Sequence, residues 1–385
     1  MKHIAYISSP YFADCDLPLL QELRQIADVD YYLVIGKSSQ QATLINLEVK
    51  SEGDVFPATA YPELKRLEEF TDLNKVFVIN MPKGHDWSPQ NLKAVWSAVQ
   101  FIKNRQYDVV HATYPFRYGS FAFYLLRRNM LLTMHDPTPH SSDMGRLNRF
   151  HRWVAFRMVN HFLVLSHSIK EEFISRYHLE KKHIHESRLS IYTHLQKTIP
   201  AEFSQHGYVL FVGSINPHKG IEYLCEAIEK VAVRHPSIKL IVAGRGNFYF
   251  DVSKYLQSGV IEVINRFITD EELAALIRQS AMVVCPYVDA TQSGVIMSAF
   301  SLKKPVIATA VGAIPEMLTD HVHGLLVPPR ESSSLANAIE TLLESPDIIE
   351  EMKTNIIHDY SEGIRSWKYI AHEYADIYNE IAERR

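Results

Sequence analysis

Two successive series of short apolar runs, with helical patterns between them, constrain the fold of this 385-residue chain more than any other feature. Runs that are apolar on both faces and separated by helices are typical of a parallel sheet covered by helices on both sides. In the first half we expect strands at 3–8, 30–34, 76–79, 109–112, 131–134 and 162–165, and helices at 17–26, 90–103, 117–127 and 144–159.

The pattern restarts after a polar stretch between Tyr192 and Gly207, which we interpret as a linker. The second series predicts strands at 208–212, 239–243, 260–264, 282–285 and 306–308, and late helices at 335–343, 348–360 and 367–383. The last helix has one apolar face and must pack on another surface. The sequence therefore predicts two doubly wound α/β domains, at 1–195 and 205–365, with a final helix at 366–385.

Composition excludes several classes of protein. Forty Lys and Arg residues against 44 Asp and Glu residues give a net charge of −4, which argues against a general nucleic-acid partner. Three widely spaced cysteines have neither a disulfide framework nor metal-ligand spacing. We find no targeting segment and no membrane span, and we expect a soluble, cytoplasmic protein.

Ligands of open parallel sheets bind beyond the carboxyl ends of the strands, so we expect the ligand-binding residues in the loops that directly follow the strands. The loop after the strand at 208–212 contains Gly213, which permits a tight turn, and Lys219, which lies at a helix start. A cation beside free backbone N–H groups is a phosphate site. The alternative is a solvated lysine in an ordinary turn.

A second loop, 286–295, leads from a strand into a helix. Thr291, Gln292 and Ser293 can cap that helix, and Gly294 allows close approach to its first N–H groups. A helix N-terminus of this kind would hold a diphosphate, although an ordinary N-cap explains the same residues. A third loop, 310–316, ends at a glutamate that caps a helix in the simplest interpretation.

The first half offers His135, directly after a strand, as an acid, base or hydrogen-bond donor. Because the chain has 19 histidines, a histidine at a strand end is unremarkable, and we interpret His111 and His161 as satisfied, partly buried residues. Asp14 and Asp16 form a pair that we interpret as helix caps rather than as metal ligands.

Basic and aromatic residues alternate over 146–161. A basic amphipathic helix can lie on an anionic membrane surface, which would make the protein peripheral to a membrane. The same helix could instead pack its aromatic residues inward. Both interpretations stay open at this point.

The second half resembles the donor-binding domain of the retaining family-four glycosyltransferases, which have the GT-B fold. The resemblance rests on the runs FVGSINPHKGIEYL, INRFITDEELAALI, CPYVDATQSG, KKPVIATAVGAIPEML and HGLLVPP, in that order over most of 208–345. The first half resembles the acceptor domain more loosely, through DVVHATYPF, LLTMHD and FLVLSHSIKEEF. In this family the two domains face a cleft, and the final helix commonly crosses back to the first domain.

The resemblance implies roles for named residues. Lys219 would bind donor phosphates, the turn at Ser293, Gly294 and Val295 would give N–H groups to the diphosphate, and Arg266 would add charge. His135 would point at the transferred sugar. The predicted catalytic residues are His135, Lys219 and Asp289, and the predicted donor-binding residues are Gly213, Ser214, Arg266, Thr291, Gln292, Ser293, Gly294, Val295 and Ser298.

The chain departs from the family at a paired glutamate motif. Ala290 and Ser298 stand at its two positions, Asp289 can replace the first glutamate, and Ser214 stands where an arginine is usual. The second glutamate normally holds the nucleotide ribose. Members with an Ala-Thr-Gln-Ser-Gly run form a recognisable variant.

The resemblance implies a metal-independent, retaining transferase of the hexosyltransferase type. It would move a sugar from a nucleotide-diphosphate sugar to a hydroxyl of a glycan, lipid-linked or protein acceptor, in bacterial-type polysaccharide or glycoconjugate synthesis. We expect the nucleotide sugar to be a co-substrate and no cofactor to be needed. A degenerate, nucleotide-sugar-binding partner subunit is the first alternative, motivated by the missing glutamates. A nucleotide-sugar epimerase of similar fold is the second.

Overall fold

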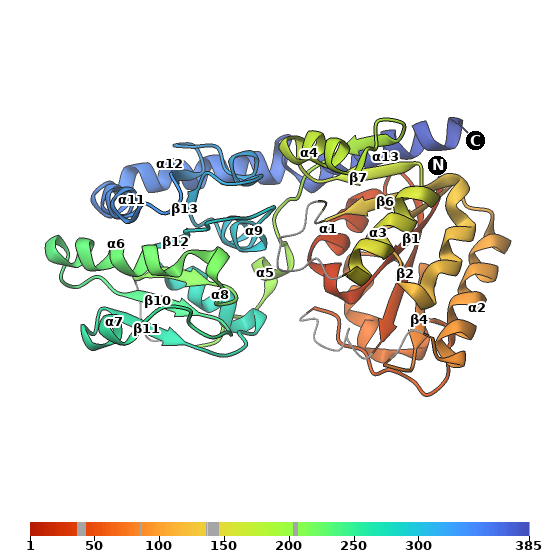
Figure 1. Ribbon diagram of the computed structural model, residues 1–385, viewed down its shortest axis with the longest axis horizontal. Coiled ribbons are helices and arrows are strands. Elements are labelled where there is room, and N and C mark those ends of the chain that lie inside the picture. The colour runs from red at the N-terminus through yellow and green to blue at the C-terminus, as the bar shows by residue number, and fades with distance from the viewer. Residues whose placement is uncertain (37–43, 85–86, 136, 138–145, 203–206, 385) are drawn as a thin grey trace. The chain divides into compact units, whose positions relative to one another are not determined.

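The computed structural model describes residues 1–36, 44–84, 87–135, 137, 146–202 and 207–384. Contacts divide the chain into two compact units: unit 1 is Met1–Arg188 with Trp367–Arg385, and unit 2 is Leu189–Ser366. Each unit contains one mainly parallel sheet between helices (Figure 1). The predicted tandem of α/β domains is therefore confirmed.

Unit 1 has an eight-stranded sheet in the order β3-β4-β2-β1-β5-β6-β7-β8. Its described strand pairs are parallel except for β3 and β4. The strands are β1 His3–Ser8, β2 Asp28–Gly36, β3 Asp54–Pro57, β4 Val76–Met81, β5 Val109–Ala112, β6 Met130–Met134, β7 His161–Val164 and β8 His183–Glu186. The helices are α1 Ala13–Leu23, α2 Pro89–Arg105, α3 Arg146–Met158, α4 His167–Tyr177 and α13 Trp367–Glu383.

Unit 2 has a six-stranded parallel sheet in the order β11-β10-β9-β12-β13-β14. Numbered within the unit, this is the 3-2-1-4-5-6 order of dinucleotide-binding folds. The strands are β9 Val209–Val212, β10 Leu240–Ala243, β11 Ile261–Ile264, β12 Met282–Cys285, β13 Val306–Thr309 and β14 Gly324–Val327. The helices are α5 His194–Lys197, α6 Ile221–Arg234, α7 Ser253–Gln257, α8 Asp270–Gln279, α9 Gly294–Ser301, α10 Ile314–Met317, α11 Ser332–Glu344 and α12 Pro346–Ile357.

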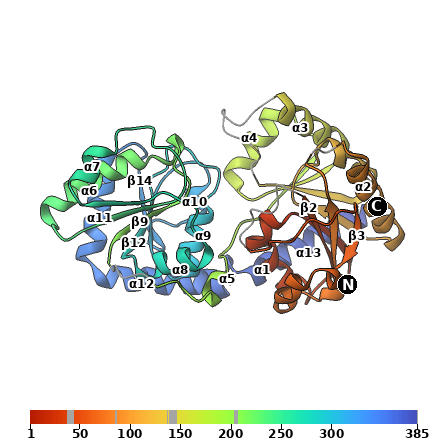
Figure 2. The ribbon, with the colours of Figure 1, turned by 90° about the horizontal axis from the view of Figure 1, so that it is seen from below.

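The final helix, α13, belongs to unit 1 although it follows unit 2 in the sequence. It packs against α1 and β5, as Figure 2 shows for α1. The apolar face expected from the sequence is buried, with Ile370 and Tyr378 inaccessible to solvent. At its edge, Arg188 donates to the Glu373 carboxylate at 2.8 Å. An apolar stripe of this kind stabilises a helix by removing its surface from water.

Several expectations about local structure were wrong. The predicted α-helix at 117–127 is a 3₁₀ segment, Tyr118–Asn129, in which buried Phe123 and Leu126 are three residues apart, the period of a 3₁₀ helix. The first helix begins at Ala13 and ends at Leu23, not at 17 and 26. The described part of the predicted linker belongs to unit 2, because Leu195 is buried and Arg278 donates to the carbonyls of Leu195 and Gln196.

Three strands were missed: β3, β8 and β14. β3 is a short antiparallel edge strand, and β8 reads HIHE, so neither has the apolar run that marks a buried strand. β14 is short and begins with Gly324, whose lack of a side chain lets the Val306 backbone lie against it.

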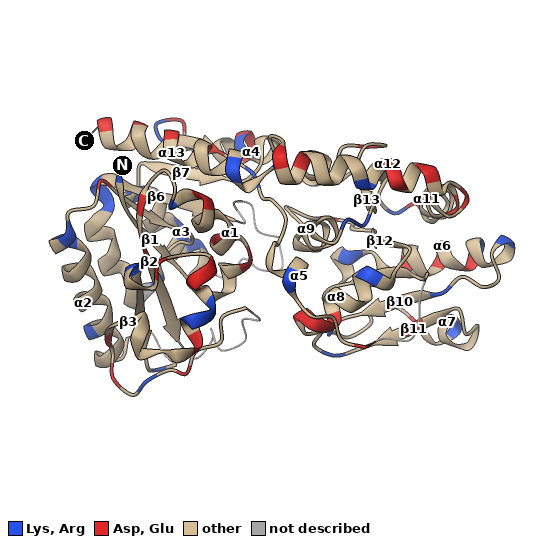
Figure 3. Cartoon of the chain, turned by 180° about the vertical axis from the view of Figure 1, so that it is seen from behind, with Lys and Arg blue, Asp and Glu red and all other residues tan. Residues whose placement is uncertain are grey.

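Charged residues of both signs are distributed over each unit, as the small net charge of −4 suggests (Figure 3). Among the described helices, none combines the length and the apolar character that crossing a membrane requires.

The histidines at positions 111 and 161 of unit 1 have hydrogen-bonding partners, as predicted. His111 on β5 is fully buried, with Nδ1 2.8 Å from the Tyr378 hydroxyl and Nε2 2.7 Å from the Thr133 hydroxyl. His161 Nδ1 lies 3.2 Å from His185 Nε2. Burial lowers the pKa of His111 to about 3 and that of His161 to about 4, so both rings are neutral at pH 7.

We predict that the protein loses stability as the pH falls from 6.5 towards 4. The unfolded chain then binds protons that folded His111 excludes, at a cost of up to about 1.4 kcal/mol per pH unit for one such group. His111→Gln cannot titrate, so its melting temperature should depend less on pH over this window. Melting curves of both proteins from pH 8 to pH 4 test this, and equal slopes would contradict it.

Candidate functional site

The strand order reverses at one place in the unit 2 sheet, between β9 and β12. β10 lies on one side of β9 and β12 lies on the other, so the connections that leave β9 and β12 run in opposite directions along the sheet. Ligands of open α/β sheets bind at this point. The first two loops identified in the sequence, 212–220 and 286–295, are the loops that start here.

Close backbone contacts hold these loops together. A side chain at Gly220 would overlap the Pro286 carbonyl, and one at Gly312 would overlap the Ala290 carbonyl. Both glycines have positive φ angles, 62° and 50°, which other residues adopt at a cost. In addition, the Val288 N–H donates to the His218 carbonyl at 2.9 Å. The loops after β9, β12 and β13 therefore form one continuous backbone surface.

Lys219 is the cation of this surface. It ends a short 3₁₀ turn, Pro217–Lys219, directly before α6, and its Nζ lies 4.1 Å from the centroid of the Tyr287 ring. Tyr287 is buried, with its hydroxyl 3.0 Å from the Ser293 Oγ. Burial lowers the pKa of Lys219 because the charged form is poorly solvated. A charge held in this way interacts strongly with a bound anion.

The N-terminus of α9 lies at the end of the second loop. Ser293 caps it, because its Oγ accepts from the Ile296 N–H at 3.4 Å, which confirms the capping interpretation. At Gly294, a side chain would approach the Tyr192 hydroxyl to 2.8 Å, so a glycine fits best. Through the bond from Tyr287 to Ser293, Lys219 and the start of α9 belong to one connected group.

The two positions of the missing glutamate pair are buried. Ala290 is 5% exposed and Ser298 is 4% exposed. The Ser298 Oγ donates to the Gly294 carbonyl at 3.0 Å, within its own helix. Asp289 is exposed beside them, and its N–H approaches the His218 carbonyl at 3.4 Å. Thr291 and Gln292 are half-buried in the same loop.

Other predicted residues have partners of their own. Arg266 is exposed and forms a bidentate ion pair with Glu272, with its Nη1 2.8 Å from Oε2 and its Nη2 2.6 Å from Oε1. Glu272 in turn closes the capping box of α8 with Thr269. Ser214 is exposed, and its Oγ accepts from the Asn216 side-chain amide at 2.8 Å. The positive charge of Arg266 is therefore already balanced by a carboxylate.

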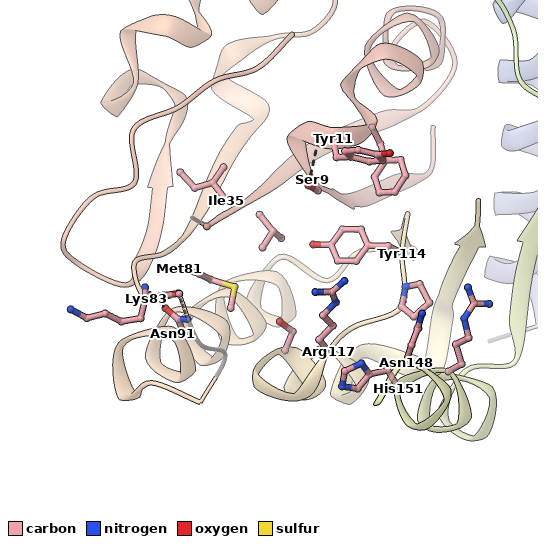
Figure 4. A pocket seen from close by; sticks show the side chains of 17 residues that line it. Ser9, Tyr11, Ile35, Met81, Lys83, Asn91, Tyr114, Arg117, Asn148 and His151 are labelled. Carbon is pink, nitrogen blue, oxygen red and sulfur yellow. Dashed lines mark hydrogen bonds between the residues drawn. The ribbon is translucent and has the colours of Figure 1, made fainter. Parts of the chain in front are cut away.

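Unit 1 contains a pocket of about 560 Å³ at its own point of strand reversal, between β1 and β5. Figure 4 shows Tyr114 and Arg117 pointing into it. The segment after β1 supplies Tyr11 and Phe12 to its wall. The remaining lining residues come from the ends of β2 and β4, from α2, from the segment after β5 and from α3.

His135 lies beside this pocket. Its ring stacks on Phe12 at a centroid distance of 4.1 Å and an angle of 15°. Burial lowers its pKa to about 4, so the imidazole is neutral at pH 7. The Nε2 atom is buried and has no hydrogen-bond partner among the described residues. Of the neighbouring run, Asp136 and 138–140 lie outside the described residues.

Sequence reasoning missed the wall of the unit 1 pocket. Tyr11, Phe12, Tyr114 and Arg117 lie in loops directly after β1 and β5. The rule used for unit 2, that loops after neighbouring strands carry ligands, could have identified them. It requires knowing that β1 and β5 are neighbours, which the order of strands along the chain does not reveal.

A cluster with metal-ligand spacing among the described residues lies elsewhere. It consists of His3, Asp28 and Asp30, which lie at the starts of β1 and β2. The pocket lies at the other ends of these strands. Lys75 pairs with Asp28, and Arg105 Nε lies 3.5 Å from Asp30.

The interpretation of Asp16 as a cap was wrong: it is buried and accepts from the Tyr6 hydroxyl at 2.8 Å.

Comparison with known proteins gives matches to both halves of the chain. The family model described as glycosyl transferases group 1 matches residues 206–345, and that described as glycosyltransferase family 4 matches residues 54–186. Alpha-D-kanosaminyltransferase of Streptomyces kanamyceticus is 29% identical over 150 residues, which are 38% of this chain and 39% of that protein. The match spans less than half the length of that relative.

Solved structures match over the whole chain. Sucrose-phosphate synthase from Thermosynechococcus elongatus has a TM-score of 0.68 at 18% identity, with 100% of both chains covered. Anabaena Alr3699/HepE in complex with UDP-glucose has a TM-score of 0.62 at 18% identity, covering 100% of this chain and 99% of that one. At this identity, the likeness establishes a shared fold.

We predict that Gly312→Ala destabilises unit 2 more than Gly259→Ala does. Both glycines have positive φ angles, 50° and 69°, so both variants carry the left-handed backbone cost of about 1 kcal/mol. Only at Gly312 would the new side chain overlap another backbone, whereas the space around Gly259 is open. We expect a total loss of at least about 2 kcal/mol for Gly312→Ala. Urea unfolding measures both, and equal losses would contradict the close packing.

Proposed function

We propose that this chain, which belongs to glycosyltransferase family four and has the GT-B fold, transfers a sugar from a nucleotide-diphosphate sugar to a hydroxyl group of an acceptor. One observation carries the proposal: Lys219 and the N-terminus of α9 are joined through Tyr287 and Ser293 at the strand reversal of unit 2. A desolvated cation beside the N-terminal amides of a helix suits a diphosphate. The matching fold of Alr3699/HepE, solved with UDP-glucose, supports a nucleotide sugar as donor.

The same groups suit the chemistry of transfer. The bond between the sugar C1 and the diphosphate oxygen breaks, and negative charge grows on the leaving diphosphate. Lys219 and the amides at Gly294 and Val295 would stabilise that charge without rearranging, so no metal ion is needed in this proposal. The acceptor oxygen forms its bond to C1 on the same face, which retains the configuration, and its proton passes to the departing phosphate oxygen.

Unit 1 would supply the acceptor side. Its pocket is large enough for a sugar ring with substituents, and His135 lies against its Phe12 wall. Because the imidazole is neutral at pH 7, we assign it a hydrogen bond to a sugar hydroxyl rather than a charged role. Its buried Nε2 is the atom available for that bond.

The acceptor could be a lipid-linked glycan, because the outer face of α3 suits a membrane surface. Leu147, Phe150 and Trp153 on α3 are 57, 43 and 55% exposed, and Arg149 and Arg157 are exposed on the same helix. Apolar side chains between cations favour the interface of an anionic membrane. We therefore propose peripheral membrane contact and a role in glycoconjugate or polysaccharide synthesis.

A second candidate function is a partner subunit that binds nucleotide sugars without transferring them. Its support is the absence of a carboxylate at the family's ribose-binding position, where Ser298 Oγ bonds within its own helix. A relative named as the gpi3 subunit of phosphatidylinositol N-acetylglucosaminyltransferase is 24% identical over 228 residues. Binding of donor without turnover on any acceptor would favour this candidate.

We predict that Lys219→Ala abolishes donor binding. In a thermal-shift screen of UDP, GDP, ADP and dTDP with their sugar conjugates, a ligand at 100 times its Kd stabilises the native protein by about 2.7 kcal/mol. The matched control is Lys254→Ala, because Lys254 Nζ also lies over a tyrosine ring, 4.2 Å from the Tyr255 centroid, but on exposed α7. A nucleotide shift that survives in Lys219→Ala would refute the assignment.

We predict that His135→Phe lowers the rate of sugar transfer by about 100-fold or more, whereas donor binding persists. Phenylalanine keeps a ring for stacking on Phe12 and removes only the hydrogen-bonding nitrogens. His135→Gln, which restores a hydrogen-bonding group, should recover part of the rate. Initial rates with the donor found above measure both variants, and full activity of His135→Phe would remove His135 from the site.

A further inference from the structure

The unit 1 pocket is positively charged although the whole chain is not. The sequence carries a net charge of −4, yet the described lining of this pocket contains Lys83, Arg117 and Arg152 and no acidic residue. A cavity lined by charges of one sign concentrates ligands of the other sign. The excess of cations is therefore a local property of this pocket.

Arg117 is the cation that carries the argument. It follows β5, it is exposed, and Figure 4 shows its side chain projecting into the pocket. No ion pair between Arg117 and a carboxylate is present among the described residues. By contrast, Arg152 is buried and donates to the Pro137 carbonyl at 3.0 Å. Arg117 is therefore positioned to bind a ligand rather than to support the fold.

The backbone on both sides of the pocket is fixed. The Arg117 carbonyl accepts from the Ser120 N–H at 2.8 Å, which starts the 3₁₀ segment. Across the pocket, Asn91 on α2 bonds both backbone groups of Lys83, each at 3.1 Å. The backbone is thus anchored on both sides of the pocket, and Figure 4 shows Arg117, not Lys83, projecting towards its centre. Arginine suits a phosphate in particular, because its guanidinium offers paired donors.

Aromatic side chains form another part of the wall. Tyr11 is 76% exposed, and the rings of Phe12 and Tyr114 are nearly parallel, at an angle of 19° and a centroid distance of 6.1 Å. Because the Phe12 ring already stacks on His135, the rings of Tyr11 and Tyr114 are the ones that can pack against the C–H face of a sugar. Asn148 and His151 on α3 add polar groups suited to hydroxyls.

We propose that this pocket binds a phosphorylated sugar, whose ring lies on the aromatic wall and whose phosphate is bound by Arg117. This rests on the proposed function, within which it identifies the acceptor class: a hydroxyl compound that carries a phosphate, either free or as the head of a lipid. Arg117 is then the residue that determines specificity for charged acceptors.

The test measures binding by calorimetry in a Lys219→Ala background, so that phosphate at the unit 2 site does not confuse the result. The probes are α-D-glucose 1-phosphate, its neutral counterpart methyl α-D-glucoside, and inorganic phosphate and pyrophosphate. Decyl glucosyl phosphate against decyl glucoside, in detergent micelles, separates a lipid source from a free one. Glucuronic acid tests whether a carboxylate suffices.

We expect phosphorylated probes to bind at least ten-fold more tightly than their neutral counterparts. Arg117→Ala should reduce that preference to less than three-fold, and Arg117→Lys should restore part of it. The matched control is Arg128→Ala, an exposed arginine at the other end of the same 3₁₀ segment that does not line the pocket. A preference confined to the decyl pair identifies a lipid headgroup as the source.

Three outcomes would overturn the proposal: a preference under three-fold in the parent, an unchanged preference in Arg117→Ala, or no binding of any phosphorylated probe. The donor screen separates these from failure of the proposed function. If nucleotides bind the unaltered protein but no phosphate preference exists, only the acceptor class is wrong. If no nucleotide binds while the preference is found, the transfer proposal fails and the pocket remains an anion site.

Discussion

Contact between backbones at glycine positions is the constraint on which the unit 2 site depends. Gly244 lies against Gly213, Gly220 against the Pro286 carbonyl, and Gly312 against the Ala290 carbonyl. Since each contact leaves no space for a side chain, the loops after four strands form a single surface. Their amides then have fixed directions, and fixed dipoles stabilise a developing charge without the cost of reorganisation. The ability of these loops to bind an anion would therefore depend mainly on the backbone amides.

The environment of each cation decides what it can do, and three cations illustrate this. Lys219 is desolvated over Tyr287, so its charge is weakly screened and its pKa is lowered. Arg266 is solvated and paired with Glu272, which leaves it little attraction for a further anion. Arg117 is exposed within a pocket that lacks acidic residues in its described lining. From residue type alone, the three cations would be expected to bind an anion equally well.

The sequence predicted much of the fold because buried parallel strands are apolar on both faces, as β5 and β12 are. It predicted the capping role of Ser293 for a similar reason, since a cap depends on neighbours in the chain. It failed for β8, whose polar residues hide a strand, and for 117–127, where tertiary contacts select a 3₁₀ helix. The pairing of Arg266 with Glu272 depends on side-chain geometry. The pocket wall of unit 1 depends on the order of the strands in the sheet. Neither can be read from a local sequence pattern.

The two sites differ in construction, and the ligands that we propose for them would account for the difference. A diphosphate presents the same oxygens whatever sugar it carries, so amides and one lysine would suffice to bind it. Acceptors vary in shape and charge, so the proposed acceptor pocket would rely on side chains such as Tyr11 and Arg117, which come from several elements. Side chains can change without disturbing the sheet, whereas Gly220 and Gly312 cannot. This is a physical reason for the family resemblance to be stronger in the second half of the chain, and for acceptor specificity to be sought in the first.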